Sequence, residues 1–310
     1  MTDAAVPPQR EELPEDDNRS ALVENVREAM GALPFYFTSP INIEGLDAGD
    51  LFALNSLLGG AIEIQTVDNL NRMREVWDPD EQWQQYGFKR FPQSFPDVRL
   101  VKEQTDSIPA LGIELKGWYL LSKESVPSFR FAATRSACSP WDLIAVVPWT
   151  LSNVLSGTPM AHKPFVEQAR YAADMRTYYW QHLREDPSTG PRSDADNAIA
   201  SPTGCGPYPR SRAEVSDKPA ADGGGNFGRL ARVTGLMDEW IEELLDTPVS
   251  GIPSRHWIKF LAAFSESKDP TAVSKSIETL LRKSAPDMST SDAKVVVELI
   301  YDIGRLVPPP

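Results

Sequence analysis

The sequence predicts an α/β protein, with a central mixed sheet flanked by helices and followed by a C-terminal helical subdomain. Short runs rich in Val, Ile, Leu and aromatic residues recur between helical patterns in the first half of the chain. One run, Asp142–Trp149, is almost entirely apolar, as expected of a strand covered on both faces. From residue 230 onward the periodicity is helical. With 310 residues, 41% of them hydrophobic, the chain can bury a large core.

Two neighbouring strands are the centre of this prediction. The runs 95–101 and 111–121 are separated by a polar segment with turn-forming residues, so a hairpin is the simplest connection. Folding the chain back in this way lays Asp97 opposite the segment that contains Glu114 and Lys116. Because side chains alternate along a strand, Glu114 and Lys116 share one face. The hairpin therefore gathers three charged side chains.

Charged side chains inside an apolar strand are costly unless they are paired or hold a metal. Two carboxylates close together repel each other, and a divalent cation would neutralise them. Mg²⁺ prefers one or two carboxylates, completed by waters and phosphate oxygens. A lysine beside such a pair stands where an attacking water or a developing phosphate charge needs a cation.

The pattern Pro96-Asp97, sixteen residues, then Glu114-Leu115-Lys116 resembles the signature of the PD-(D/E)XK nucleases, and the layout around it most resembles a type II restriction endonuclease. The resemblance implies a restriction-endonuclease-like core in which Asp97 and Glu114 bind Mg²⁺ and Lys116 assists the hydrolytic water. It also implies sequence-specific cleavage of double-stranded DNA by a homodimer, with a cognate DNA methyltransferase acting on the same site. The alternative interpretation is a solvent-facing Glu/Lys pair on an edge strand.

A long helix is predicted from about Ala48 to Trp77, with Asp47 as its N-cap. Glu63 falls on a packed face of this helix. Many restriction enzymes carry a helix acid near the catalytic hairpin, so the resemblance implies that Glu63 borders the metal site. The alternative is a helix-surface Glu close to Arg72 or Lys89.

DNA contacts are expected from two segments, in spite of a net charge of −13. The acids concentrate at the N-terminus and around 238–246, which leaves room for a basic face elsewhere. Segment 80–93 carries Gln, Lys and Arg side chains that can bind base edges or phosphates, and a helix predicted over 164–184 carries Arg170 and Arg176, which can contact phosphates. The expected contacts are Gln84, Lys89, Arg90, Arg170 and Arg176. The alternatives are an ordinary polar connection and a helix with a structural role.

The remaining patterns divide the chain into four parts. They are a mobile acidic tail (1–18), an α/β nuclease core (19–185), a long flexible loop or linker (186–228) and a helical subdomain (229–310). Within the core we also predict a short helix from Ser20 to Gly31, an extended edge over 33–43 and a strand over 128–134. The subdomain should hold helices over 230–245, 255–265, 271–283 and 291–306.

Composition narrows the function further. No apolar run approaches the roughly 20 residues that a bilayer crossing needs, and the acidic N-terminus lacks the features of a signal peptide. A cytoplasmic protein without membrane contact is expected. Two cysteines and three scattered histidines argue against a zinc site and a disulfide framework. Two other functions stay open: a nuclease of the same superfamily without sequence specificity, acting in repair or phage defence, and a non-catalytic interaction protein.

Overall fold

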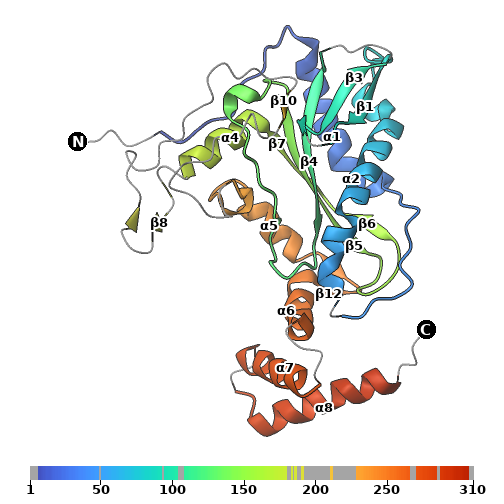
Figure 1. Cartoon of the computed structure of the whole chain (residues 1–310), viewed down its shortest axis with the longest axis vertical. Coiled ribbons are helices and arrows are strands. Elements are labelled where there is room, and N and C mark those ends of the chain that lie inside the picture. Colours follow the sequence, from blue (N-terminus) through green and yellow to red (C-terminus); the bar gives the residue numbers. More distant parts are fainter. Residues whose placement is uncertain are drawn as a thin grey trace.

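The computed structural model describes residues 6–306, with gaps at 49, 93, 104–107, 180–182, 184, 187–189, 192–209, 212–227, 266–269 and 285–286. A curled, mixed sheet lies at the centre with helices on both sides (Figure 1). Its strand order is β1-β3-β4-β5-β6, and β7 also pairs with β5. The predicted α/β core with a mixed sheet is confirmed.

The strands of the sheet are short except for the two at its centre. They are β1 (Tyr86–Arg90), β3 (Val98–Lys102), β4 (Leu111–Tyr119), β5 (Leu143–Leu151), β6 (Pro159–Ala161) and β7 (Phe165–Gln168). Strands β4 and β5 are parallel, whereas the other pairs are antiparallel. Every residue of β5 is buried, which confirms the prediction of a strand covered on both faces.

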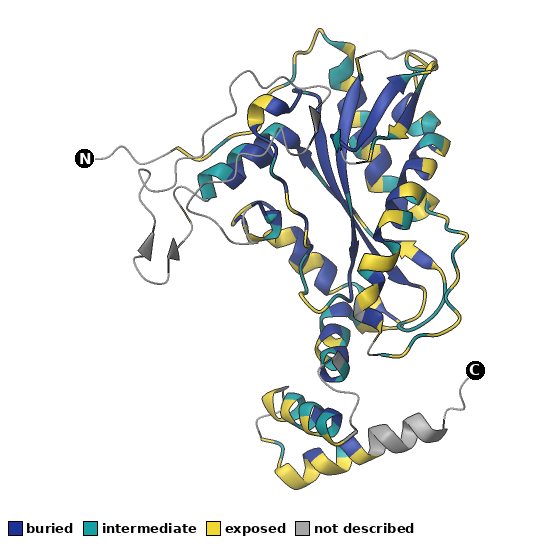
Figure 2. Ribbon diagram, viewed as in Figure 1, coloured by how far each residue is buried: buried dark blue, intermediate teal, exposed yellow. Residues whose placement is uncertain are grey.

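The described helices form two layers and an extension. They are α1 (Asn18–Tyr36), α2 (Leu54–Arg72), α3 (Arg74–Trp77), α4 (Ala169–Tyr178), α5 (Asp238–Leu245), α6 (Ser254–Ser265), α7 (Pro270–Ser284) and α8 (Thr290–Leu306), with short 3₁₀ turns at Leu51–Ala53, Arg135–Ala137 and Leu230–Arg232. Helices α1 and α3 pack on one face of the sheet and α4 and α5 on the other. Figure 2 shows the buried residues concentrated on the sheet and on the helix sides that face it.

Helix α2 contributes to both layers. Leu54 and Ile62 belong to the apolar cluster on the α5 side of the sheet, while Val67 and Leu70 belong to the cluster on the α1 side. Strand β4 pairs with β3 only as far as Ile113, so the rest of β4 has one open side, where a helix can reach both clusters. Helix α2 therefore runs beside β4, a position that matters for the candidate site.

Two helix predictions are corrected in their bounds. Helix α1 begins after the N-cap Asp17 rather than at Ser20, and it continues through Gly31 to Tyr36 because Met30 and Leu33 are buried. Tertiary packing thus outweighs the low helix propensity of glycine. The long helix predicted over 48–77 is instead a 3₁₀ turn, α2 and α3, with the break at Met73.

Four further differences concern strands. The segment 80–93 contains β1, and the helix predicted from 164 is preceded by β7, so that helix begins at Ala169. The short β6 was also missed. The strand predicted over 128–134 is absent, since that segment makes only an isolated bridge, between Arg130 and Arg229.

The small paired elements lie outside the main sheet. They are β2 (Ser94–Phe95) with β10 (Arg210–Ser211), β8 (Glu185–Asp186) with β9 (Gly190–Pro191), and β11 (Pro248–Val249) with β12 (Ile252–Pro253). Most of the predicted flexible loop, 186–228, lies outside the described residues. The predicted edge over 33–43 is helical as far as Tyr36, and Ile43 then makes an isolated bridge with Gly157.

The two ends of the described chain attach to the core differently. In the N-terminal segment, Arg10 pairs with Glu167 at 2.7 Å, and Glu11 pairs with Arg170 at 3.2 Å. The predicted tail thus lies against β7 and α4 at these residues. The helical character of the C-terminal region is confirmed: α5 and the first part of α6 join the main core, while the end of α6 packs with α7 and α8 in a small separate cluster.

His162, which follows β6, makes the stability of the fold depend on pH. Its Nε2 lies 2.9 Å from the Thr150 hydroxyl, and burial lowers its pKa from 6.5 to about 4. Between these two values the unfolded chain binds the proton more readily than the folded protein. We expect the free energy of unfolding to fall by about 2 kcal/mol from this group between about pH 7 and about pH 5.

The measurement is denaturant unfolding of the wild type and of His162→Gln at both pH values. Glutamine keeps a hydrogen-bonding group near Thr150 but does not titrate, so the variant should lose less stability on acidification. Since all other titrating groups are common to both proteins, the difference between the two curves isolates His162. Parallel curves would contradict the assigned shift.

Candidate functional site

The candidate site lies where β3 and β4 separate. The two strands pair antiparallel through Val98↔Ile113, Arg99↔Gly112 and Leu100↔Leu111, which confirms the predicted hairpin. One step beyond the first of these pairs, the same register brings Asp97 opposite Glu114. There the strands diverge, and the two acids lie at the point of divergence. The sheet thus supplies two carboxylates from adjacent strands at one position.

Beyond Ile113, β4 is no longer paired with β3, and side-chain oxygens accept hydrogen bonds from its amides instead. Three alternate amides of β4 that point away from β5 each donate to a side-chain oxygen. Leu115 N donates to Asp97 Oδ1 at 2.8 Å, Gly117 N to Glu63 Oε1 at 3.4 Å, and Tyr119 N to Asn55 Oδ1 at 2.9 Å. Unpaired buried amides are costly, so these acceptors stabilise the open edge. We call Asn55, Glu63 and Asp97 the edge acceptors.

Gly117 allows α2 to approach this edge closely. A Cβ at this position would lie 3.3 Å from the carbonyl oxygen of Gly59 and 3.6 Å from the Cβ of Ile62. Most side chains larger than hydrogen would therefore push α2 away from β4. The short separation is what lets the α2 side chains reach the β4 amides.

Glu63 lies between two cations. Its Oε2 accepts from the Arg90 guanidinium at 2.9 Å, and its Oε1 lies 3.7 Å from the Lys116 ammonium. Glu63 is buried rather than displayed on the helix surface. It therefore borders the Asp97–Glu114–Lys116 cluster, and the helix-surface alternative near Arg72 or Lys89 does not describe its position.

Glu114 and Lys116 differ in their access to solvent. Glu114 is 2% exposed, whereas the Lys116 side chain keeps 40% of its surface in contact with solvent. Both project from the same face of β4 because they are two residues apart. The pair thus has its carboxylate buried and its ammonium group on the solvent-exposed side of the cluster, which we call the opening. A solvent-facing Glu/Lys pair, the other interpretation of this motif, does not fit the burial of Glu114.

A buried polar layer supports this face of the sheet. Arg99 is opposite Gly112 in the register and interacts electrostatically with Asp142 and Asp97. Burial lowers the pKa of the Arg99 guanidinium, and the two carboxylates oppose that shift. Burial likewise raises the pKa of Asp142 well above its usual range, against the effect of the Ser139 amide, which donates to it at 2.7 Å. The sequence patterns used above did not single out Arg99 or Asp142.

Cys138 is inert as a nucleophile. It is fully buried, and burial raises the pKa of its thiol well above the ordinary value, so the thiolate form is suppressed. Cys138 thus packs as a small buried hydrophobic residue. Cys205 lies outside the described residues.

The five expected DNA contacts are in different environments. Gln84 and Lys89 are exposed, and Arg90 is partly exposed while paired with Glu63. Arg170 donates to the carbonyl of Cys138 and pairs with Glu11. Arg176 is 0% exposed and donates to the carbonyls of Phe131 and Ala133 at 3.0 and 2.8 Å.

This burial gives Arg176 a structural role, and no surface of its guanidinium is available to a phosphate. Lys89 and Arg90 are consecutive residues of β1 and therefore project from opposite faces of the sheet, while Gln84 lies in the turn before the other end of the strand. Of the three, Arg90 adjoins the candidate site, through its contact with Glu63.

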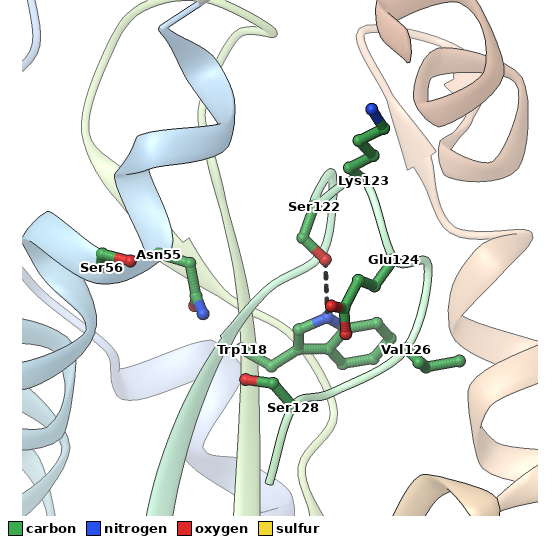
Figure 3. A pocket seen from close by; sticks show the side chains of 8 residues that line it. All are labelled: Asn55, Ser56, Trp118, Ser122, Lys123, Glu124, Val126 and Ser128. Carbon is green, nitrogen blue, oxygen red and sulfur yellow. Dashed lines mark hydrogen bonds between the residues drawn. The ribbon is translucent and has the colours of Figure 1, made fainter. Parts of the chain in front are cut away.

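A pocket of about 290 Å³ opens beside the far end of β4 (Figure 3). Asn55 and Ser56 line it from α2, Trp118 from β4, and Ser122 and Glu124 from the following loop. The Trp118 indole donates to the Ser122 hydroxyl at 3.2 Å, as Figure 3 shows. The pocket and the candidate site thus share α2 and β4, with Asn55 serving both as pocket wall and as edge acceptor.

The donor set fits a magnesium ion. Among the described residues, no three His, Cys, Asp or Glu side chains come together as a complete metal cage. Mg²⁺ does not need one, because one or two carboxylates with waters and substrate oxygens suffice. Asp97 and Glu114 supply such a pair, and a carboxylate that accepts one amide keeps lone pairs for a cation.

None of the helices in the described part of the chain is both long enough and apolar enough to cross a bilayer. Comparison of the chain with models of protein families, with curated proteins and with solved structures finds no match. Conclusions about function therefore depend on the geometry and chemistry of the cluster itself.

Proposed function

We propose that this protein is a Mg²⁺-dependent, sequence-specific endonuclease that cleaves double-stranded DNA in the manner of a type II restriction enzyme. One observation carries the proposal. Glu63 from α2 contacts Lys116 and the Gly117 amide, and Asp97 accepts the Leu115 amide, so two acids from separate elements meet the stretch of β4 that carries Glu114 and Lys116. The four charged residues among these are those that the resemblance to PD-(D/E)XK nucleases selects. A chance match to a short motif gives no reason for Glu63 to contact this part of β4. Glu63 nevertheless accepts from the amide of Gly117, 54 residues away in the chain, and lies beside the Lys116 ammonium.

The roles follow from position. Asp97 and Glu114 would hold the cation between adjacent strands, and a bound Mg²⁺ would activate water and neutralise charge on the phosphate. Lys116, at the opening, would orient the attacking water and stabilise the charge that develops on the phosphate oxygens. Glu63 would keep the Lys116 ammonium in place from the side of α2. The water forms a new bond to phosphorus while one ester bond breaks, so that one new end carries the phosphate and the other a hydroxyl.

The DNA surface would lie beside the opening. Arg90 contacts Glu63, and Gln84 and Lys89 would supply further amide and cationic groups along β1 and its preceding turn. Such side chains can contact both phosphates and base edges. A homodimer would place one site on each strand of a palindrome, and a methyltransferase acting on the same sequence would protect the host DNA.

Incubation of the purified protein with mixed-sequence plasmid DNA tests the proposal. Cleavage is expected with Mg²⁺ or Mn²⁺ and should stop in EDTA, because the two carboxylates need a cation to hold the phosphate. The ends of the fragments should share one short sequence. In a binding assay with Ca²⁺, a single mismatch in that sequence should cost about 1–3 kcal/mol.

The other outcomes identify the alternatives. Cleavage with ends that share no motif would favour a nuclease of repair or phage defence that contacts phosphates only. Failure to cleave any double-stranded DNA with Mg²⁺ or Mn²⁺ would reject the endonuclease and favour a non-catalytic interaction protein. Undiminished cleavage by metal-free protein in EDTA would reject the roles given to Asp97 and Glu114.

A further inference from the structure

Arg99 holds the segment that carries Asp97. Its Nε donates to the Pro96 carbonyl at 3.1 Å, and its Nη2 lies 2.8 Å from the Ser94 hydroxyl and 3.3 Å from the Phe95 carbonyl. All three acceptors immediately precede Asp97 in the chain. Because Arg99 is in β3, these hydrogen bonds fix residues 94–96, through which the chain enters β3, against the strand itself.

Two further contacts complete this arrangement. The guanidinium carbon of Arg99 lies 4.4 Å from the centre of the Phe91 ring, and the Phe91 amide donates to the carbonyl of Asp97 at 2.7 Å. The backbone of Asp97 is thus hydrogen-bonded to that of Phe91, and the guanidinium of Arg99 stacks on the Phe91 ring. The Asp97 side chain is fixed separately through the Leu115 amide at 2.8 Å. Few rotations are left to the carboxylate.

We propose that Arg99 is a positioning residue, which holds the Asp97 carboxylate opposite Glu114 and thereby sets how tightly the site binds a divalent cation. The inference rests on the proposed function, but it concerns a residue that the nuclease motif does not include. Arginine suits this role because its planar fork meets several acceptors at fixed angles while its face stacks on a ring. Lysine offers one nitrogen and no stacking face, so Arg99→Lys keeps the charge and loses the geometry.

The experiment compares Arg99→Lys with a matched control, Arg74→Lys. Arg74 has the same kind of surroundings: it stacks on Trp77, at 4.8 Å from the ring centre, and donates to the carbonyls of Trp83 and Tyr86. It belongs to α3, outside the candidate site. Two quantities are measured for each protein: the Mg²⁺ concentration that gives half-maximal cleavage, and binding of Mn²⁺ alone by electron paramagnetic resonance.

Arg99→Lys should need about 10- to 100-fold more Mg²⁺ and should bind Mn²⁺ correspondingly more weakly, as found when groups that orient metal ligands are removed. Arg74→Lys should match the wild type in both measurements, even if its unfolding midpoint drops. Ser94→Ala removes only one partner of Arg99 and should shift the Mg²⁺ requirement in the same direction by a smaller factor. It keeps the test available if Arg99→Lys does not fold.

The failures can be told apart. If the wild type cleaves DNA and neither Arg99→Lys nor Ser94→Ala changes the Mg²⁺ requirement, the positioning role is wrong and the proposed function stands. If the wild type does not cleave but binds Mn²⁺, and Arg99→Lys weakens that binding while Arg74→Lys does not, the positioning role stands without the nuclease. Wild-type protein that neither cleaves DNA nor binds Mn²⁺ overturns both.

Discussion

Replacing Lys116 by alanine is expected to slow DNA cleavage by about 10²- to 10³-fold while leaving sequence selection intact. The ammonium lies at the opening of the cluster, 3.7 Å from Glu63, and its side chain is partly exposed to solvent. In the proposed mechanism it acts on the water and on charge that develops during the reaction, so its loss should affect the chemical step. The measurements are single-turnover cleavage with Mg²⁺ and DNA binding with Ca²⁺.

Lys102→Ala provides the control, because Lys102 lies at the other end of β3 and is also a partly exposed strand lysine. It should cleave at the wild-type rate. If Lys116→Ala cut DNA at nearly the normal rate, Glu114-Leu115-Lys116 would be an ordinary strand and the nuclease proposal would be lost. If it lost DNA binding as well as cleavage, Lys116 would be a phosphate contact rather than a participant in the chemical step.

The hairpin was predictable because both its signals are local. Alternating apolar residues identify the strands β3 and β4, and the polar segment between them indicates the reversal. Folding the chain back lays Asp97 opposite the segment that contains Glu114 and Lys116, and in the structure Asp97 and Glu114 each lie one step beyond the Val98↔Ile113 pair. The position of Glu63 was predictable only in part: helical periodicity puts it on a packed face, but its contact with Lys116 depends on how α2 lies against β4.

The segment 128–134 shows what alternation does and does not determine. Phe129 and Phe131 are buried and Arg130 is exposed, as the alternation indicates. The backbone partner is nevertheless a short stretch at 228–230 and not the sheet. Alternation reports which side chains are buried, whereas the hydrogen-bonding partner is set by tertiary structure that a single segment does not encode.

The amide-accepting role of the edge acceptors and the role of Arg99 escaped prediction for the same reason. Asn55 is an ordinary polar residue near the start of a helix, and Arg99 is a charge within an apolar strand. Their roles exist only because β3 and β4 diverge, which leaves three β4 amides to be satisfied by side chains. Where strands separate is a property of the assembled sheet. A charge inside an apolar strand was nonetheless a usable signal, since burying Arg99 requires partners.

Replacing Asp97 by asparagine is expected to reduce Mg²⁺-dependent cleavage on the order of 10³-fold, through the loss of a charged ligand. Asparagine has the same shape, and its Oδ1 can still accept the Leu115 amide that Asp97 accepts at 2.8 Å. The substitution therefore removes the negative charge and leaves the edge acceptor in place. Cleavage is measured over a range of Mg²⁺ concentrations, and unfolding by denaturant reports whether the β4 edge is intact.

Comparison with Asp97→Ala separates the two roles of this residue, as a metal ligand and as the acceptor of the Leu115 amide. Alanine removes both the charge and the acceptor, so it should match Asp97→Asn in lost cleavage and also lower the free energy of unfolding by about 1–3 kcal/mol, because a buried amide is left unsatisfied. If Asp97 served only to satisfy the Leu115 amide, Asp97→Asn would cleave like the wild type, and Asp97→Ala would lose stability without a matching loss in the chemical step. That result would reduce Asp97 to a structural residue and leave Glu114 without its partner at the proposed metal site.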